Sequence, residues 1–124
     1  MNISLLLNEL KIPFIKEYKI YDKNNNYYKM DFAILDNNNN LQLFIEYDGI
    51  QHFGRISGWF TEERRLQLEK SDEFKNKYCK EHNIPLIRIP YWELNNINKK
   101  YLLNKINLTA EPDMEEAQEL ESDE

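Results

Sequence analysis

The sequence predicts one α/β domain in which a mixed sheet is flanked by helices. Three stretches that suit strands follow one another through short polar turns, which is typical of an antiparallel meander. A long helical stretch then separates them from a fourth strand-like run, IPLIRIPY, and this order favours an α/β sheet. The length of 124 residues suits a single domain with a modest core.

The first half of the chain is predicted to form one helix and three strands. Residues 2–10 carry leucine and isoleucine at helical spacing, and Pro13 ends that segment because proline cannot continue a helix. The strands are predicted over 14–21, 28–35 and 41–47. The intervening stretches DKNNN and DNNNN are rich in turn residues. These three strands form the antiparallel part of the predicted sheet.

The second half is predicted to add two helices and a central strand. The elements are a loop over 53–60, a helix over 62–82 with a break near Ser71, a strand over 84–91 and a helix over 95–108. Thr61 precedes two glutamates, a pattern that favours a helix N-cap. The spacing of Leu66, Phe74 and Tyr78 predicts that they share the buried side of the long helix.

Charge divides the chain into two parts. The net charge is -6, but the last 14 residues hold eight of the 22 acids and no base, which leaves 14 acids against 16 bases elsewhere. We therefore expect a domain over residues 1–108 and an acidic, disordered tail over 109–124. The alternative for the tail is a segment that binds a protein partner or competes with nucleic acid for the domain.

Composition excludes several classes of protein. With 41% hydrophobic residues, eight tyrosines and six phenylalanines, the chain is predicted to fold. No apolar run approaches the roughly 18 residues of a membrane span, and the first residues lack the features of a signal peptide. Cys79 is the single cysteine, so a disulfide framework or a cysteine-based zinc site is excluded, and we expect an intracellular protein.

Acidic side chains gather where the third predicted strand ends. Glu46, Asp48 and His52 follow within seven residues, and strand alternation puts Glu46 and Asp48 on one face. Asp31 lies in the preceding strand, so pairing of the two strands brings it to Glu46. Two adjacent carboxylates repel unless a cation lies between them, and Mg²⁺ prefers oxygen ligands. The sequence therefore predicts a magnesium site that activates a phosphoryl group and a water.

A histidine and a helical face complete the predicted site. His52 has the ordinary pKa of a general base at neutral pH, and Asp72 on the long helix is the candidate that orients it. Lys75 shares a helical face with Asp72 and is predicted to stabilise phosphate charge. The candidates for contacts with a nucleic-acid backbone are Arg55, Arg64, Arg65, Lys70 and Lys77. Each residue alone also has an ordinary interpretation as surface charge or structural histidine.

The set KMDFAIL, LFIEYDGIQHF, SDEFKNKYC and IPLIRIPYWE resembles a known family. Over roughly residues 3–95 it is similar to the small endonuclease domains related to the very-short-patch-repair endonuclease, within the restriction-endonuclease-like PD-(D/E)xK superfamily. A branch associated with phages and giant viruses is the nearest match. The resemblance implies a core sheet between helices and a phosphodiesterase that depends on Mg²⁺ or Mn²⁺.

The resemblance also implies roles for individual residues. Asp31 matches the metal-binding aspartate and Glu46 the second acid of the family motif, while Asp48 stands where the family usually has lysine. The histidine-containing branch replaces that lysine by a histidine paired with a helical aspartate, which His52 and Asp72 match. Lys75 matches a basic position one turn later.

One expected residue departs from the family pattern. The position of a first-helix glutamate that helps to hold the metal falls near Ile3; Glu9 is on a different phase, and Glu17 is on the first strand. The additional site candidates are Asp48, Gln51 and Glu17. The leading prediction is a metal-dependent DNA endonuclease. The alternative is a weakened nuclease-fold module that binds nucleic acid or, through its acidic tail, a protein partner.

Overall fold

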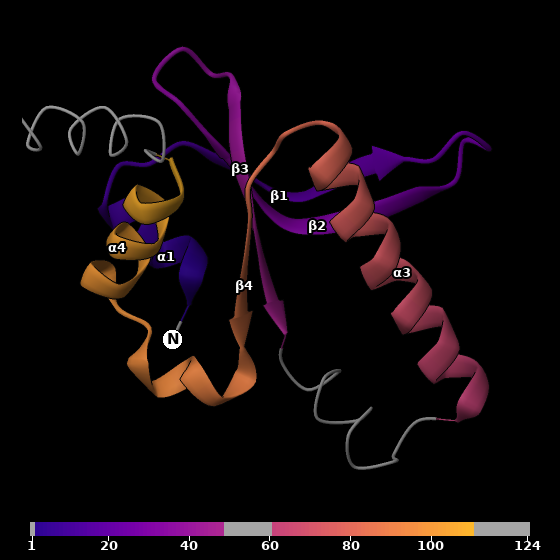
Figure 1. Ribbon diagram of the computed structural model, residues 1–124. Coiled ribbons are helices and arrows are strands. Elements are labelled where there is room, and N and C mark those ends of the chain that lie inside the picture. The colour runs from indigo at the N-terminus through magenta and orange to yellow at the C-terminus, as the bar shows by residue number, and fades with distance from the viewer. Residues whose placement is uncertain (1, 49–60, 111–124) are drawn as a thin grey trace, which may run out of the picture.

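A four-stranded mixed sheet lies between two layers of helices (Figure 1). The computed structural model describes residues 2–48 and 61–110. Its elements are α1 (Ile3–Glu9), β1 (Phe14–Tyr21), β2 (Tyr27–Leu35), β3 (Leu41–Asp48), α3 (Glu62–Glu81), β4 (Leu86–Pro90), the 3-10 helix η1 (Tyr91–Asn96) and α4 (Lys99–Ala110). The strand order is β1-β2-β3-β4, and β4 is parallel to β3 while the other pairs are antiparallel. The predicted α/β class with an antiparallel meander and one further strand is confirmed, but the prediction that this further strand is central is wrong, because β4 is at the edge of the described sheet.

The two asparagine-rich turns of the meander have the same construction. Oδ1 of Asp36 accepts hydrogen bonds from the backbone N–H groups of Asn38 and Asn40 at 2.8 and 2.9 Å, and Asp22 accepts two equivalent bonds in the first turn. Asn39 has φ of 64°, a left-handed conformation that asparagine tolerates better than most residues. The asparagines thus fix short turns that bring consecutive strands together, and the register of β2 against β3 shifts once more between Ile34 and Leu35.

Polar residues begin the two long helices, and the structure corrects both predicted helices. Thr61 is the N-cap of α3, as predicted, and its hydroxyl accepts a hydrogen bond from the N–H of Arg64 at 3.1 Å. The predicted break near Ser71 is wrong because α3 is continuous from Glu62 to Glu81. The last helix begins at Lys99 rather than residue 95, since the Asn98 side chain accepts from the N–H of Tyr101 at 2.8 Å.

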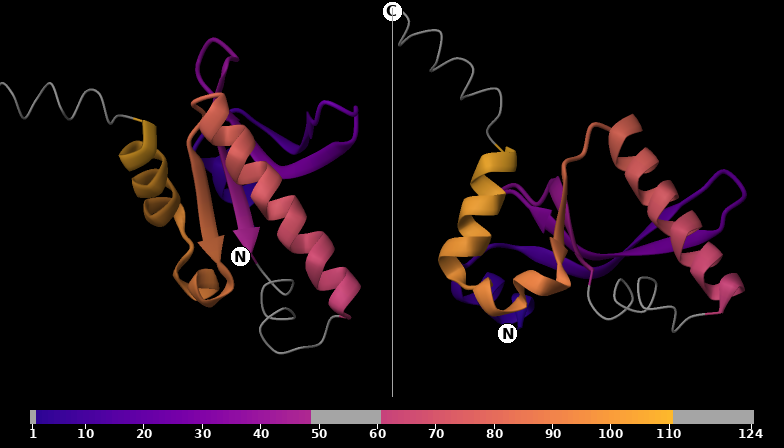
Figure 2. Two further views of the ribbon diagram at one scale, coloured as in Figure 1. Left: turned by 45° about the vertical axis from the view of Figure 1, so that its right-hand side comes forward. Right: turned by 60° about the horizontal axis from the view of Figure 1, so that its bottom comes forward.

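Each face of the sheet carries its own apolar cluster. α1 and α4 cover one face (Figure 2), where the buried residues are Ile3, Leu6, Leu7, Phe32, Ile34, Leu43, Ile45, Ile87, Ile89, Ile97, Leu102 and Ile106. α3 covers the other face with a smaller cluster of Ile20, Met30, Ala33, Phe44 and Cys79. The prediction that Leu66 joins this cluster is wrong: it is 52% exposed, while Phe74 and Tyr78 pack as expected.

In the middle of the β1–β2 hairpin the side-chain alternation breaks, so that the residues before and after this point face opposite sides of the sheet. Met30 and Phe32 are two residues apart on β2 and should share a face, yet they belong to clusters on opposite faces. On β1 the matching irregularity is Glu17, whose φ of 53° is unusual for a residue with a side chain. As a result the turn end of the hairpin packs beside α3, and Asp31 lies at the point where the alternation breaks.

None of the helices in the described ranges is both long enough and apolar enough to cross a membrane.

Candidate active site

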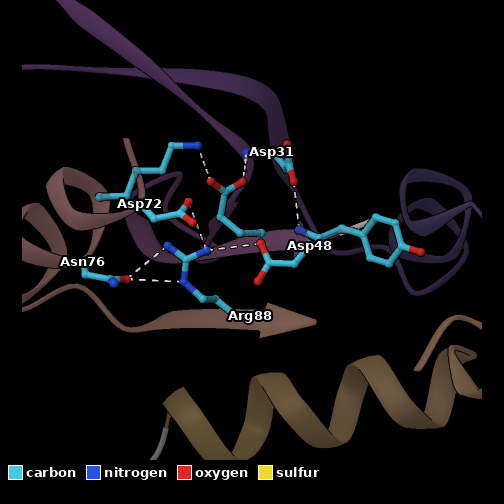
Figure 3. Close-up of polar contacts among 8 residues, drawn as sticks. Asp31, Asp48, Asp72, Asn76 and Arg88 are labelled. Atoms are coloured by element: carbon cyan, nitrogen blue, oxygen red, sulfur yellow. Dashed lines mark hydrogen bonds and ion pairs between the residues drawn. The ribbon is translucent and has the colours of Figure 1, made fainter. Parts of the chain in front are cut away.

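Asp31 and Glu46 meet where β2 and β3 part. The backbone pairing of these strands reaches Phe32 and Ile45, and the two acids are the next residues along. Beyond this point, hydrogen bonds from the backbone to the two side chains take the place of the backbone–backbone hydrogen bonds (Figure 3). The N–H of Asp31 donates to Oε2 of Glu46 at 3.0 Å, and the N–H of Tyr47 donates to Oδ2 of Asp31 at 2.8 Å. The predicted convergence of the two acids is confirmed in position.

Lys75 joins this pair from α3. Its ammonium group donates a hydrogen bond to Oε1 of Glu46, so both oxygens of that carboxylate have a partner. Glu46 is 4% exposed and is the buried charged residue of the described core. A buried carboxylate needs such partners because the loss of water is costly for a charge. Two acids from adjacent strands and one helical lysine therefore form a single cluster, here called the carboxylate–lysine cluster.

The environment changes the acidity of Glu46. Burial, and after it the nearby charge of Asp31, raises the pKa of Glu46 from 4.5 to about 7. The ammonium group of Lys75 acts in the opposite direction without cancelling those two effects. Glu46 is therefore held in a position where its ionised form is unfavourable, and perturbed acids of this kind concentrate at functional sites.

Arg88 of β4 organises a second layer of charges beside the cluster. Its Nη1 lies 3.2 Å from Oδ1 of Asp48 and 3.8 Å from Oδ1 of Asp72. Its Nε and Nη2 donate to Oδ1 of Asn76 at 3.3 and 3.1 Å (Figure 3). One guanidinium thus connects the end of β3 to two turns of α3, as the five donors of arginine allow.

Sequence reasoning missed Arg88. The signal was a single charged residue inside the apolar run IPLIRIPY, because a charge within an apolar strand requires a partner. The structure supplies the partners through the parallel pairing of β4 with β3, which places Arg88 next to Glu46 in register. The predicted common helical face of Asp72, Lys75 and Asn76 is confirmed, since all three reach this charged region.

Three of the predicted site residues lie outside the described residues: Gln51, His52 and Arg55. The general-base role of His52 and its orientation by Asp72 remain predictions. Among the described residues, Arg88 lies 3.8 Å from Asp72.

The candidate glutamates from the first part of the chain point to other partners. Glu17 lies 3.5 Å from Lys29 in an exposed pair on the hairpin. Glu9 lies 3.1 Å from Lys99 of α4. Ile3, at the position where the family resemblance implies a glutamate, is buried in the core. The described contacts of these residues are therefore made away from the carboxylate–lysine cluster.

The predicted nucleic-acid contacts on α3 do not share one face. Arg64 lies eleven residues before Lys75, which is close to three full turns, so it shares the face of Lys75 nearer the start of the helix. Lys70 and Lys77 follow a line on the opposite, solvent-facing side. Arg65 is engaged within the helix by Glu62 and Glu69.

The cluster has the donor set that a hard divalent cation uses. Mg²⁺ keeps several waters and needs one or two carboxylates from the protein. Asp31 and Glu46 supply them, and a cation would relieve the repulsion that contributes to the raised pKa of Glu46. Among residues 2–48 and 61–110, no group of three or more His, Cys, Asp and Glu side chains is arranged to hold a metal. Within these ranges the candidate site is thus a pair of acids with a lysine.

Comparisons with protein-family models, with curated proteins and with solved structures found no match for this chain.

Proposed function

We propose that this protein is a metal-dependent DNA endonuclease with a restriction-endonuclease-like fold. The observation that carries the proposal is the carboxylate–lysine cluster, in which Asp31 and Glu46 from adjacent strands meet Lys75 from the covering helix. Two acids and a cationic donor at the end of a central strand are the groups that hydrolysis of a phosphodiester needs. The mixed sheet between helices supports the fold assignment at the level of architecture.

Asp31 and Glu46 are the residues that would hold Mg²⁺ or Mn²⁺. When bound, such an ion polarises a phosphoryl oxygen and lowers the pKa of a water. Lys75 places a positive charge beside Glu46, where it stabilises the negative charge that develops on the phosphate during attack. His52 is proposed to take the proton from the attacking water, and Asp72 to orient His52. Arg88 is a positioning residue, because it holds Asp48, Asp72 and Asn76 in place.

The test is cleavage of plasmid, mismatched duplex and single-stranded DNA in the presence of Mg²⁺ or Mn²⁺. We expect Asp31→Asn and Glu46→Gln each to lower the cleavage rate by roughly 100-fold or more, since each removes a charge at the reacting group. Lys75→Met should lower it by a similar factor. The matched control is Glu73→Gln, which makes the same chemical change at an exposed position of α3.

Retained cleavage by Glu46→Gln at the rate of the Glu73→Gln control would contradict the assigned site. The absence of cleavage of all three DNA substrates by the unmodified protein with either metal would contradict the endonuclease itself.

One observation favours the second candidate, a nuclease-fold module that binds nucleic acid or a protein partner without cleaving. The described acids of the site already have cationic partners, since Lys75 contacts Glu46 and Arg88 contacts Asp48 and Asp72. Such a network can simply fasten α3 to the sheet.

Calorimetric titration with Mn²⁺ separates the two candidates. The endonuclease requires binding that Asp31→Asn removes. The module instead predicts the same Mn²⁺ titration for Asp31→Asn and the unmodified protein. It also predicts that Asp31→Asn still binds a partner, and that removal of residues 111–124 abolishes this binding.

A further inference from the structure

The β1–β2 hairpin presents an outward face of lysine and tyrosine. Ile20, Tyr28 and Met30 point to the α3 cluster, so strand alternation turns the residues between them the other way. This outward face consists of two cross-strand pairs, Lys19 with Lys29 and Tyr21 with Tyr27. The turn end of the hairpin extends beside α3 at the edge of the molecule (Figure 1).

The pairing of Lys19 with Lys29 is unfavourable for the stability of the hairpin. Like charges directly opposite each other on antiparallel strands destabilise the pairing. Lys19 lies 4.6 Å from the ring centroid of Tyr27, and Lys29 lies 3.5 Å from Glu17. The two ammonium groups therefore contact different neighbours. Four lysines and two acids lie between residues 14 and 29, and Asp22 is used by the turn. These residues of the hairpin therefore have a net charge of +2, which complements a polyanion.

The tyrosine pair adds flat aromatic surface at the same place. Tyr21 and Tyr27 are each 52% exposed, and their rings lie 6.3 Å apart at an interplanar angle of 59°. In contrast, Tyr28 on the inward face stacks on Phe74 of α3 with ring centroids 4.4 Å apart. Exposed aromatic rings between basic side chains are the combination by which proteins hold the bases and phosphates of single-stranded nucleic acid.

We propose that this outward face binds single-stranded DNA, with Lys19 and Lys29 on phosphates and Tyr21 and Tyr27 stacked on bases. Along β2 this face ends at Lys29, because the side-chain alternation breaks at Asp31 and the carboxylate–lysine cluster lies on the α3 side of the sheet. Binding by the hairpin does not rest on the proposed endonuclease function.

The binding test uses a fluorescein-labelled oligothymidylate in EDTA, so that cleavage does not interfere. Removing two lysine–phosphate contacts by Lys19→Gln with Lys29→Gln should reduce the slope of log K against log salt by about 1.4, because each contact to a single strand contributes roughly 0.7. Tyr21→Leu and Tyr27→Leu keep the apolar bulk but lose the ring, and each should weaken binding about five-fold or more.

The matched control is Lys11→Gln with Lys100→Gln, which removes the same charge from exposed positions in the α1 and α4 layer. Circular dichroism melting of each variant verifies that the hairpin still folds. The proposal requires the hairpin variants, and not this control, to lose affinity.

Equal affinity of the lysine variant and its control would overturn the proposal, as would tighter binding of duplex DNA or of an acidic peptide than of the oligothymidylate. The two proposals fail separately. Asp31→Asn should abolish cleavage while binding in EDTA persists. If the unmodified protein binds the oligothymidylate through the hairpin but cleaves nothing, the endonuclease is wrong and the hairpin assignment stands.

Discussion

The two faces of the sheet are attached to their helices in different ways. On one face α1 and α4 bury leucine and isoleucine side chains such as Leu7, Leu102 and Ile106 in a continuous apolar cluster. On the other face Cys79 is the buried residue of the 20-residue helix α3, and the helix is also held through Lys75 and through Asp72 and Asn76. One face is built mainly from apolar burial, and the other combines a small apolar cluster with charged contacts.

This difference supports the proposed position of the functional site on the α3 face. Apolar burial stabilises a fold without demanding specific partners, whereas a buried charge is costly unless every partner is placed correctly. Glu46 is such a buried charge: its pKa is raised to about 7, so its ionised form lowers the stability of the folded protein. A sequence selected for stability alone would place an apolar residue there. We therefore expect that the charged end of the α3 face lowers the stability of the fold and is kept because the proposed site requires it.

The largest effect on stability is expected from the apolar face. Leu102 has no exposed surface and packs in the α1 and α4 cluster, so Leu102→Ala should lower the free energy of unfolding by about 2–5 kcal/mol. Urea denaturation followed by circular dichroism measures this change. The cleavage rate per folded molecule should stay unchanged, because the substitution is on the opposite face from the cluster. A specific loss of cleavage in the folded fraction would show that the two faces are not independent.

The next effect is a pH dependence at the charged face. The pKa of Glu46 rises from 4.5 to about 7 on folding, so the folded protein binds more protons than the unfolded chain between these values. Stability from this group is fully present below pH 4.5 and is lost as the pH rises through 7. The loss amounts to about 3 kcal/mol if the whole shift is expressed. Urea denaturation in EDTA at a series of pH values measures it.

The control for the pH dependence is Glu46→Gln, which does not titrate. The difference in unfolding free energy between the unmodified protein and this variant should change by up to about 3 kcal/mol between pH 4.5 and 8. Identical pH profiles for the two proteins would mean that Glu46 is not perturbed, and the comparison between the faces would lose its main support.

The same comparison explains what the sequence could predict. The meeting of Asp31 with Glu46 followed only in part from local information, because the short turn at Asp36 pairs β2 with β3 and a register shift between Ile34 and Leu35 then brings the two acids together. Arg88 could not be placed in this way. Its position depends on the parallel pairing of β3 with β4, and the two strands are separated by α3 and the residues that precede it. No local rule sets the register across a connection of that length.

Helix burial was also only partly predictable. Helical spacing correctly indicated the side of α3 on which Phe74 and Tyr78 lie, but it assigned Leu66 to the same buried surface. Leu66 lies eleven residues before Lys77, close to three full turns, so it is on the solvent-facing side of α3 and is 52% exposed. Its separation of eight residues from Phe74 turns it about 80° around the helix axis, so the predicted grouping was too wide.

The smallest expected effect tests the difference between these two sides of α3. Leu66→Ala should change the free energy of unfolding by less than about 0.5 kcal/mol, because little surface is buried there and alanine favours a helix. Phe74→Ala, on the same helix, should cost about 1–3 kcal/mol through its lost stacking on Tyr28. Urea denaturation of both variants provides the measurement. Equal losses would mean that the side of α3 that carries Leu66 is also packed, whereas the expected difference assigns the contact with the sheet to the side that carries Phe74.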